Sequence, residues 1–174
     1  VARYDCDVQR IAGKEILACT KLPHSSELGY VGEIQSVNTG PILQALDAGS
    51  MPIISSTASD QQGQCYNINA DTAAAQVAIA LKARRLVYLS DVPGLLQNPK
   101  DPSSLLSSLA IDQVEPLKQE GVIAQGMLPK VNSAVQALNA GVNRVHFIDG
   151  RLAHSILLEI FTDEGIGTEI VHSH

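Results

Sequence analysis

One unit recurs three times along the chain: the end of an apolar helix, a short turn, and a short strand built almost entirely of apolar residues. It occupies residues 45–55, 80–90 and 137–148. Short apolar strands that alternate with amphipathic helices are typical of a mostly parallel sheet with helices on both faces. The pattern therefore predicts an α/β fold, a three-layer α/β/α sandwich. Ligands of such sheets bind beyond the carboxyl ends of the strands, so the segments that follow the strands are the first candidates for a site.

The first 37 residues differ from the rest of the 174-residue chain. They are irregular and extended, with an apolar run broken at Pro23, and they predict hairpin-like strands. From residue 38 onward, helices and strands alternate, beginning with a helix that ends at Gly49 and a buried strand over residues 52–55. The sequence thus predicts a strand-rich segment, residues 1–37, followed by an α/β domain, residues 38–174.

Charge and composition exclude several classes of partner. Twelve basic and 18 acidic residues give a net charge of −6 without a basic stripe, which argues against nucleic acid. Three cysteines without C-x-x-C spacing and five histidines without ligand spacing predict no disulfide framework and no metal site. No apolar run approaches the ~18 residues of a membrane span, and the first residues lack the apolar region of a signal peptide. We expect a cytoplasmic protein, or an organellar one if a transit peptide precedes this sequence.

Two amides and a carboxylate gather where a predicted strand passes into an alanine-rich helix, at residues 66–75. A turn over residues 60–63 would leave Asn67 at the edge of the sheet. Asn69 is placed to cap the helix, and Asp71 falls in its first turn, near the partial positive charge of the helix N-terminus. A stable helix start explains this pattern, and a substrate site is the alternative; the local sequence leaves both open.

Further candidates lie at other strand ends and helix starts. Residues 90–96 follow an apolar strand and form either a plain turn or a nucleotide-contacting loop. Lys130 falls in the first turn of a helix whose start is marked by Pro129. A cation there opposes the helix dipole by a few tenths to ~1 kcal/mol, and a bound anion reverses that cost; a solvated surface lysine is the alternative. Arg151, which follows another strand, is expected to form a surface ion pair.

Taken together, these segments resemble the acetylglutamate kinases of the amino acid kinase family. The motifs NINAD, SDVPG, GMLPK and FTDEGIGT occur in the order and spacing of that family, and their combination is far more specific than any one of them. The likeness covers nearly all of residues 28–170. It implies ATP-dependent phosphorylation of the side-chain carboxylate of N-acetyl-L-glutamate, the second step of arginine synthesis, with Mg²⁺ accompanying the nucleotide.

The resemblance also implies roles for individual residues. Asn67 would hold the α-carboxylate end of acetylglutamate, Asp71 would orient the catalytic lysines, and Lys130 would be one of those lysines. Glu164 and Gly165 match a loop that contributes to the inhibitor site in arginine-inhibited members. The implied nucleotide-binding residues are Ser90, Asp91, Val92, Gly94, Leu95, Leu96, Val122, Ile123, Ala124 and Met127.

The likeness is incomplete at the amino end. Family members begin with a strand that ends in lysine and glycines, followed by a second glycine loop and an arginine, and residues 1–13 here match poorly. The resemblance therefore predicts the C-terminal, nucleotide-binding portion of a kinase, with residues 1–37 as a remnant of the substrate lobe and little activity alone. Homo-oligomerisation and arginine inhibition stay open, because the family uses amino-terminal segments for both.

Two other functions stay open. Another kinase of the same family, acting on carbamate, glutamate, aspartate or UMP, would share the fold and the nucleotide loop, although NINAD and FTDEGIGT favour acetylglutamate. A non-catalytic paralogue that senses a nucleotide or arginine would also lack the amino-terminal lysine. The reading frame upstream of Val1 distinguishes a piece of an active kinase from such a paralogue.

Overall fold

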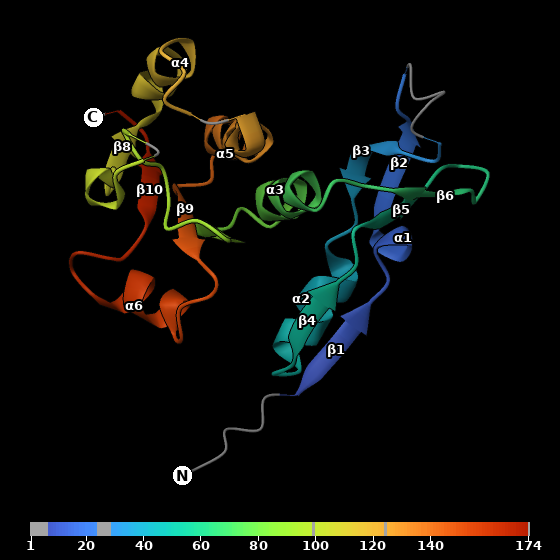
Figure 1. Ribbon diagram of the computed structural model, residues 1–174. Helices are drawn as coiled ribbons and strands as arrows, with labels where there is room; N and C mark the ends of the chain where they lie inside the picture. The colour runs from blue at the N-terminus through green and yellow to red at the C-terminus, as the bar shows by residue number, and fades with distance from the viewer. Residues whose placement is uncertain (1–6, 24–28, 99, 124, 174) are drawn as a thin grey trace. The chain divides into compact units, whose positions relative to one another are not determined.

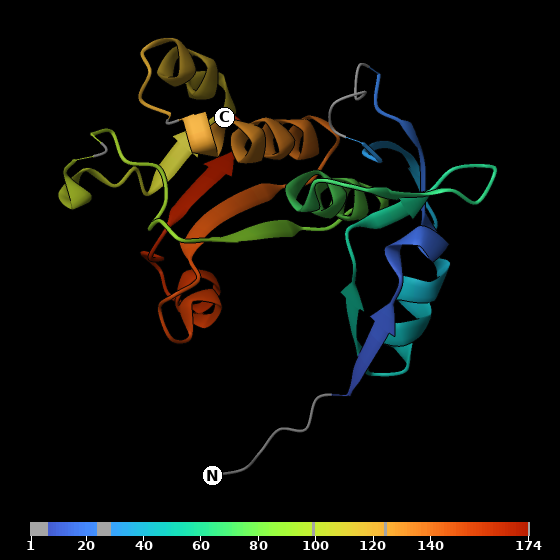
Figure 2. The ribbon, with the colours of Figure 1, turned by 45° about the vertical axis from the view of Figure 1, so that its right-hand side comes forward.

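The computed structural model describes residues 7–23, 29–98, 100–123 and 125–173 (Figures 1 and 2). The chain divides into two compact units, Val1–Leu81 and Lys82–His174. The α/β fold is confirmed, with the strands distributed over three sheets. Of the seven strand pairings among the described residues, four are parallel. The domain boundary expected after residue 37 falls inside the first unit, at the end of a strand, so the functional assignment of the two segments stays a prediction.

The first unit contains two small sheets with three helices. Four strands follow the order β3-β2-β5-β6, and β1 pairs with β4 in parallel. The antiparallel pairing of β2 with β3 confirms the predicted hairpin-like strands. The elements are β1 (Val8–Ile11), α1 (Gly13–Ile16), β2 (Leu17–Lys21), β3 (Gly32–Val37), α2 (Gly40–Asp47), β4 (Met51–Ile54), β5 (Thr57–Ser59), β6 (Cys65–Asn67) and α3 (Ala70–Ala80).

The burial predicted for β4 is wrong. Met51 and Ile53 are 49% and 53% exposed. Within the described part of the chain, β4 pairs with β1 alone, and α2 packs against this pair. Alternate side chains of a strand point to opposite faces, so a two-stranded sheet with one helical cover leaves every second side chain exposed.

The start of α3 follows the prediction. The carboxylate of Asp60 closes the preceding turn by accepting the backbone N–H of Gln62 and of Gln64, each at 2.9 Å. The chain then returns as β6, and the side chain of Asn69 accepts the backbone N–H of Thr72 at 3.1 Å. Asn69 is therefore the N-cap of α3.

The second unit has a four-stranded sheet in the order β7-β9-β10-β8, in which only the β9–β10 pairing is antiparallel among the described strands. The helix over residues 128–139 confirms the one whose start Pro129 marks. The elements are β7 (Arg85–Ser90), η1 (Pro102–Ser104), β8 (Ser108–Ala110), α4 (Ile111–Gln119), η2 (Gln125–Met127), α5 (Leu128–Asn139), β9 (Arg144–Asp149), α6 (Ser155–Phe161) and β10 (Thr168–Val171).

Two neighbouring residues of β9 show that helices cover both faces of this sheet. Phe147 stacks on Tyr88 of β7, with 5.3 Å between ring centroids, and Lys130 of α5 lies over the Tyr88 ring. His146 instead bonds to Glu159 of α6. Because successive side chains of a strand alternate between faces, α5 and α6 lie on opposite faces. Figure 2 shows α5 on one side of β9 and α6 on the other, which makes this unit a three-layer sandwich.

Candidate functional site

The carboxyl ends of β7 and β9 meet at one edge of the second unit's sheet. Ser90 lies opposite Asp149 in the parallel register. The Gly150 N–H donates to the Ser90 carbonyl at 2.8 Å and extends this pairing by one residue. The loop that begins at Asp91 and the turn that contains Arg151 therefore leave the sheet side by side. This is the edge at which parallel α/β sheets bind their ligands.

A bidentate ion pair forms at this edge. The Asp149 carboxylate accepts two hydrogen bonds from the Arg151 guanidinium, one from Nε at 2.9 Å and one from a terminal nitrogen at 2.7 Å. It also accepts a hydrogen bond from the Arg151 backbone N–H at 2.9 Å. These hydrogen bonds lower the pKa of Asp149 to about 2, and they also raise the pKa of Arg151, with a smaller contribution from Asp91. The ion pair predicted for Arg151 is confirmed.

This pair makes stability depend on pH in the acid range. A carboxyl group whose pKa is lower in the folded chain contributes stability above its ordinary pKa and loses that contribution as the pH falls toward the folded value. We expect the free energy of unfolding to fall between about pH 4 and pH 2, and Asp149→Asn to remove part of that fall. Urea denaturation at several pH values measures both. Equal pH dependence in the two proteins would contradict the assignment.

The loop at residues 90–96 is anchored by the last strand. The backbone N–H of Leu95 donates to the buried Thr168 hydroxyl at 2.8 Å. Gly94 has φ +152°, and a Cβ there would lie 2.5 Å from the Thr168 hydroxyl oxygen, so the close approach requires glycine. The SDVPG and FTDEGIGT motifs are therefore in direct contact, which gives a physical reason for their occurrence in the same chain.

Thr168→Val tests this anchor with almost no change of shape. The substitution leaves the buried Leu95 N–H without its acceptor, and we expect the free energy of unfolding to fall by about 1–3 kcal/mol. Urea denaturation gives this value, and hydrogen exchange should show faster exchange at Leu95. Thr162→Val is the matched control, because Thr162 is exposed. An equal loss in both variants would contradict a specific anchor.

Lys130 lies where the sequence placed it, as the third residue of α5. Pro129 precedes it in the first helical turn. Its ammonium nitrogen is 5.9 Å from the centroid of the Tyr88 ring, two residues before the end of β7. The positive end of the α5 dipole and the Lys130 cation therefore lie together near the carboxyl edge of the sheet. The partial positive charge of the helix end and the charge of the Lys130 ammonium group together favour an anion there.

The other residues predicted to bind a nucleotide divide by burial. Leu95, Ile123 and Met127 are buried, whereas Asp91 is exposed. Ser90, Val92, Leu96 and Val122 are half-buried, and Gly94 is held against Thr168. Ala124 lies outside the described residues. Their binding of a nucleotide stays a prediction.

The two residues predicted from NINAD to contact substrate and lysine lie in the first unit. Asn67 ends β6 with an exposed side chain, and its backbone N–H donates to the Tyr30 carbonyl at 2.8 Å. Asp71 is half-buried in the first turn of α3. Lys130 belongs to the second unit. Since each unit is described by itself, the orientation of Lys130 by Asp71 stays a prediction.

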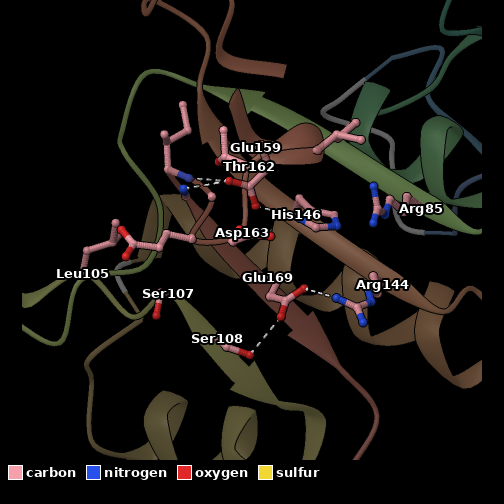
Figure 3. A pocket seen from close by; sticks show the side chains of 15 residues that line it. Arg85, Leu105, Ser107, Ser108, Arg144, His146, Glu159, Thr162, Asp163 and Glu169 are labelled. Carbon is pink, nitrogen blue, oxygen red and sulfur yellow. Dashed lines mark hydrogen bonds and ion pairs between the residues drawn. The ribbon is translucent and has the colours of Figure 1, made fainter. Parts of the chain in front are cut away.

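A cavity of about 530 Å³ lies in the second unit on the side of α6 (Figure 3). Arg85 and Arg144, the first residues of β7 and β9, line it, so it lies toward the amino ends of these strands. The predicted effector residues Glu164 and Gly165 also line it. Sequence reasoning assigned no site role to Arg85, Arg144, His146 or Glu159. The sequence feature that could have indicated this site is Glu159, the one charged residue in the apolar run of residues 155–161.

Glu159 organises one wall of this cavity. Its carboxylate accepts His146 Nδ1 at 2.7 Å and the backbone N–H groups of Ile166 and Gly167 at 2.7 and 2.9 Å. Burial alone would raise the pKa of the Glu159 carboxyl, but the hydrogen bonds, with the Ile166 N–H the largest, outweigh burial and lower the pKa. Glu159 is therefore an ionised carboxylate that ties α6 to the loop before β10.

The pairing with Glu159 fixes the tautomer of His146. A carboxylate only accepts, so Nδ1 must carry the hydrogen, and Nε2 is left as the second polar atom of the ring. Nε2 is buried and has no hydrogen-bond partner in the described part of the chain. A buried polar atom without a partner costs free energy until a ligand or water satisfies it.

Neither metal coordination nor a membrane span emerges from the described residues. They contain no group of three or more His, Cys, Asp or Glu side chains that could hold a metal ion. In the same part of the chain, no helix is long and apolar enough to cross a bilayer.

Comparisons with solved structures agree with this fold. N-acetylglutamate synthase from Neisseria gonorrhoeae, complexed with coenzyme A and N-acetylglutamate, matches with a TM-score of 0.85 and 28% identity over 98% of this chain and 39% of that one. Carbamate kinase from Giardia lamblia bound to AMP-PNP matches with a TM-score of 0.65 and 21% identity over 82% of this chain and 47% of that one. The similarity to carbamate kinase, at 21% identity, shows the fold alone.

Sequence comparisons identify the family. Acetylglutamate kinases from Syntrophomonas wolfei and Moorella thermoacetica are 49% and 44% identical to the chain, over 93% and 95% of its length but 57% and 62% of theirs. The chain thus spans somewhat more than half the length of these relatives. The profile described as the amino acid kinase family matches residues 3–149. With most of its length matched by that profile, this chain belongs to the amino acid kinase family.

Proposed function

We propose that this chain is the nucleotide-binding portion of an acetylglutamate kinase, which transfers a phosphoryl group from ATP to the side-chain carboxylate of N-acetyl-L-glutamate. The observation that carries the proposal is the position of Lys130 at the N-terminus of α5, over a ring of β7, at the edge where the loop of residues 90–96 leaves the sheet. The acetylglutamate kinases at up to 54% identity support this acceptor over others of the family.

Phosphoryl transfer needs little covalent chemistry from a protein and much positioning of charge. Lys130 and the N-terminal N–H groups of α5 would stabilise the negative charge that spreads over the transferring group. The anchored loop after β7 would receive the nucleoside, with Ser90 to Leu96 on one side and Val122 to Met127 on the other. Mg²⁺, accompanying the nucleotide, would neutralise part of the phosphate charge.

The substrate end of the site would come from the first unit. Asn67, exposed at the end of β6, would hold the α-carboxylate of acetylglutamate. Asp71 would orient Lys130 by accepting its hydrogen bonds. In this proposal residues 1–37 belong to the substrate lobe and residues 38–174 to the nucleotide domain. The isolated chain would bind ATP weakly and turn over little, and the kinase would work where arginine is made, in the cytoplasm or an organelle.

The test is a phosphorylation assay on the complete kinase that carries this sequence, with N-acetylglutamate, glutamate, aspartate and carbamate as competing acceptors. We expect kcat/KM to be highest for N-acetylglutamate by at least two orders of magnitude, because a site built for the acetylamino group leaves polar groups unpaired with the other acceptors. A preference for another acceptor would replace the proposed substrate. ATP binding without any turnover would favour the sensing paralogue.

The cavity beside α6 supports a second, regulatory role, the binding of arginine. Arginine carries two cationic groups and one carboxylate. Glu164 would meet a cationic group, and Arg85 would meet the carboxylate. Calorimetric titration with arginine tests this, with citrulline as the matched ligand that lacks the guanidinium charge. We expect Glu164→Gln to weaken arginine binding about tenfold and to leave ATP binding unchanged. Equal binding of citrulline would contradict the assignment.

A further inference from the structure

Arg151 is exposed to solvent and yet held in one orientation. Its side chain is 66% exposed, whereas the side chain of Asp149, to which it is bonded, is 10% exposed. The guanidinium donates from Nε and from a terminal nitrogen to that carboxylate. An exposed arginine ordinarily moves among many rotamers, and a bidentate bond to a fixed acid removes that freedom. Asp149 therefore holds the guanidinium at a defined position on the edge of the sheet.

The bond with Asp149 leaves Arg151 able to bind something else. A guanidinium carries more N–H groups than the two that the Asp149 carboxylate accepts. Because the side chain is mostly exposed, the remaining N–H groups are accessible to a ligand. A donor that is already oriented loses little further freedom when it binds, so this arrangement is preorganised for an acceptor such as a phosphate.

The ion pair lies on the same face of the sheet as Lys130. Tyr88 lies under the Lys130 ammonium group, and Ser90 is the next residue of β7 on that face. Asp149 is opposite Ser90 in the parallel register. Two residues of a strand rise by about 7 Å, so Asp149 belongs to the row about 7 Å beyond Tyr88, toward the carboxyl edge. Arg151 is thus held where the loop of residues 90–96 begins.

The charges at this edge give Arg151 a task. Asp149 is ionised, because hydrogen bonds from Arg151 lower its pKa to about 2. The pKa of Arg151 is raised mainly by its hydrogen bonds to Asp149 and also by the charge of Asp91, so a second carboxylate lies nearby. Two carboxylates repel the phosphates of a nucleotide, and the ammonium group of Lys130 offsets only one of them. The charge of Arg151 offsets the other.

We propose that Arg151, held by Asp149, binds the phosphates that stay with the nucleotide during transfer, the α- and β-phosphates of ATP. This inference rests on the proposed function, and it adds a residue to which the family resemblance assigns no role. In that function Lys130 meets the transferring group and the loop of residues 90–96 receives the nucleoside. A guanidinium at the start of the loop would lie between the two, where the remaining phosphates pass.

Calorimetric titration of the complete kinase with ADP, at a fixed Mg²⁺ concentration, tests the proposal. We expect Arg151→Gln to weaken ADP binding at least tenfold. Adenosine lacks the phosphates, so its binding, followed by NMR titration, should change less than twofold. Arg151→Lys should recover only part of the ADP affinity, because it keeps the charge and loses the planar, bidentate geometry.

Arg84→Gln is the matched control. Arg84 is exposed and precedes β7, at the opposite end of that strand from Ser90, so this variant should bind ADP as the wild type does. Circular dichroism checks that all variants fold. Higher salt should weaken ADP binding more steeply in the wild type than in Arg151→Gln, because the variant has lost one charge that attracts the phosphates.

Three results would overturn the proposal. Equal ADP affinity in the wild type and Arg151→Gln would remove Arg151 from the nucleotide site. Equal losses of ADP and adenosine binding would show that the ion pair only supports the loop. A wild-type kinase that does not bind ADP would overturn the proposed function together with this inference. Because ADP binding needs no acceptor, the titration separates the role of Arg151 from the choice of acetylglutamate as substrate.

Discussion

Lys130→Ala is expected to lower the kcat of the complete kinase by two to three orders of magnitude or more, the scale seen when one preorganised charge-stabilising group is removed. The ammonium group would stabilise charge that develops on the transferring phosphoryl group, so KM for ATP should change much less than kcat. Lys130→Arg should recover only part of the rate, because a guanidinium differs from an ammonium in shape and hydration.

The same substitution should leave the fold nearly unchanged. The helix dipole opposes a cation at the α5 N-terminus, whereas the contact with the Tyr88 ring favours it, and each is worth about 1 kcal/mol or less. We therefore expect the free energy of unfolding to move by less than about 1 kcal/mol in either direction. Lys100→Ala, at an exposed loop lysine of the same unit, is the control and should keep full activity. An unchanged kcat in Lys130→Ala would remove this lysine from the mechanism.

Local signals in the sequence predicted the elements that carry the candidate nucleotide site. Pro129 marked the start of α5, because caps and helix-breaking residues act within one turn. The alternation of helices and apolar strands predicted the sheet of the second unit. Since the ends of its parallel strands meet at one edge, the sequence also indicated that the segments after these strands are the first candidates for a site.

The features that the sequence did not predict depend on contacts between residues far apart in the chain. Nothing near Thr168 indicates that its hydroxyl holds the N–H of Leu95, 73 positions away. The predicted burial of β4 was wrong because the sequence of an apolar strand does not show whether one face or both faces of its sheet are covered. The sequence shows Glu159 only as one charge in an apolar helix, and its hydrogen bonds to His146 and to the loop before β10 show that it points inward. One wall of the cavity follows from that orientation.

Glu159→Ala is the substitution expected to cost the most stability. It removes the acceptor of His146 Nδ1 and of the Ile166 and Gly167 N–H groups, and each buried donor that is left without an acceptor costs about 1–3 kcal/mol. Glu159→Gln is the matched variant, because its amide oxygen can still accept the two backbone N–H groups. We expect it to lose less than half as much. Urea denaturation followed by circular dichroism measures both.

Hydrogen exchange locates the effect. The amides of Ile166 and Gly167 should exchange much faster in Glu159→Ala, whereas the amide of Asn67, bonded in the first unit, should not change. A loss below about 1 kcal/mol with unchanged exchange would mean that Glu159 does not anchor the loop.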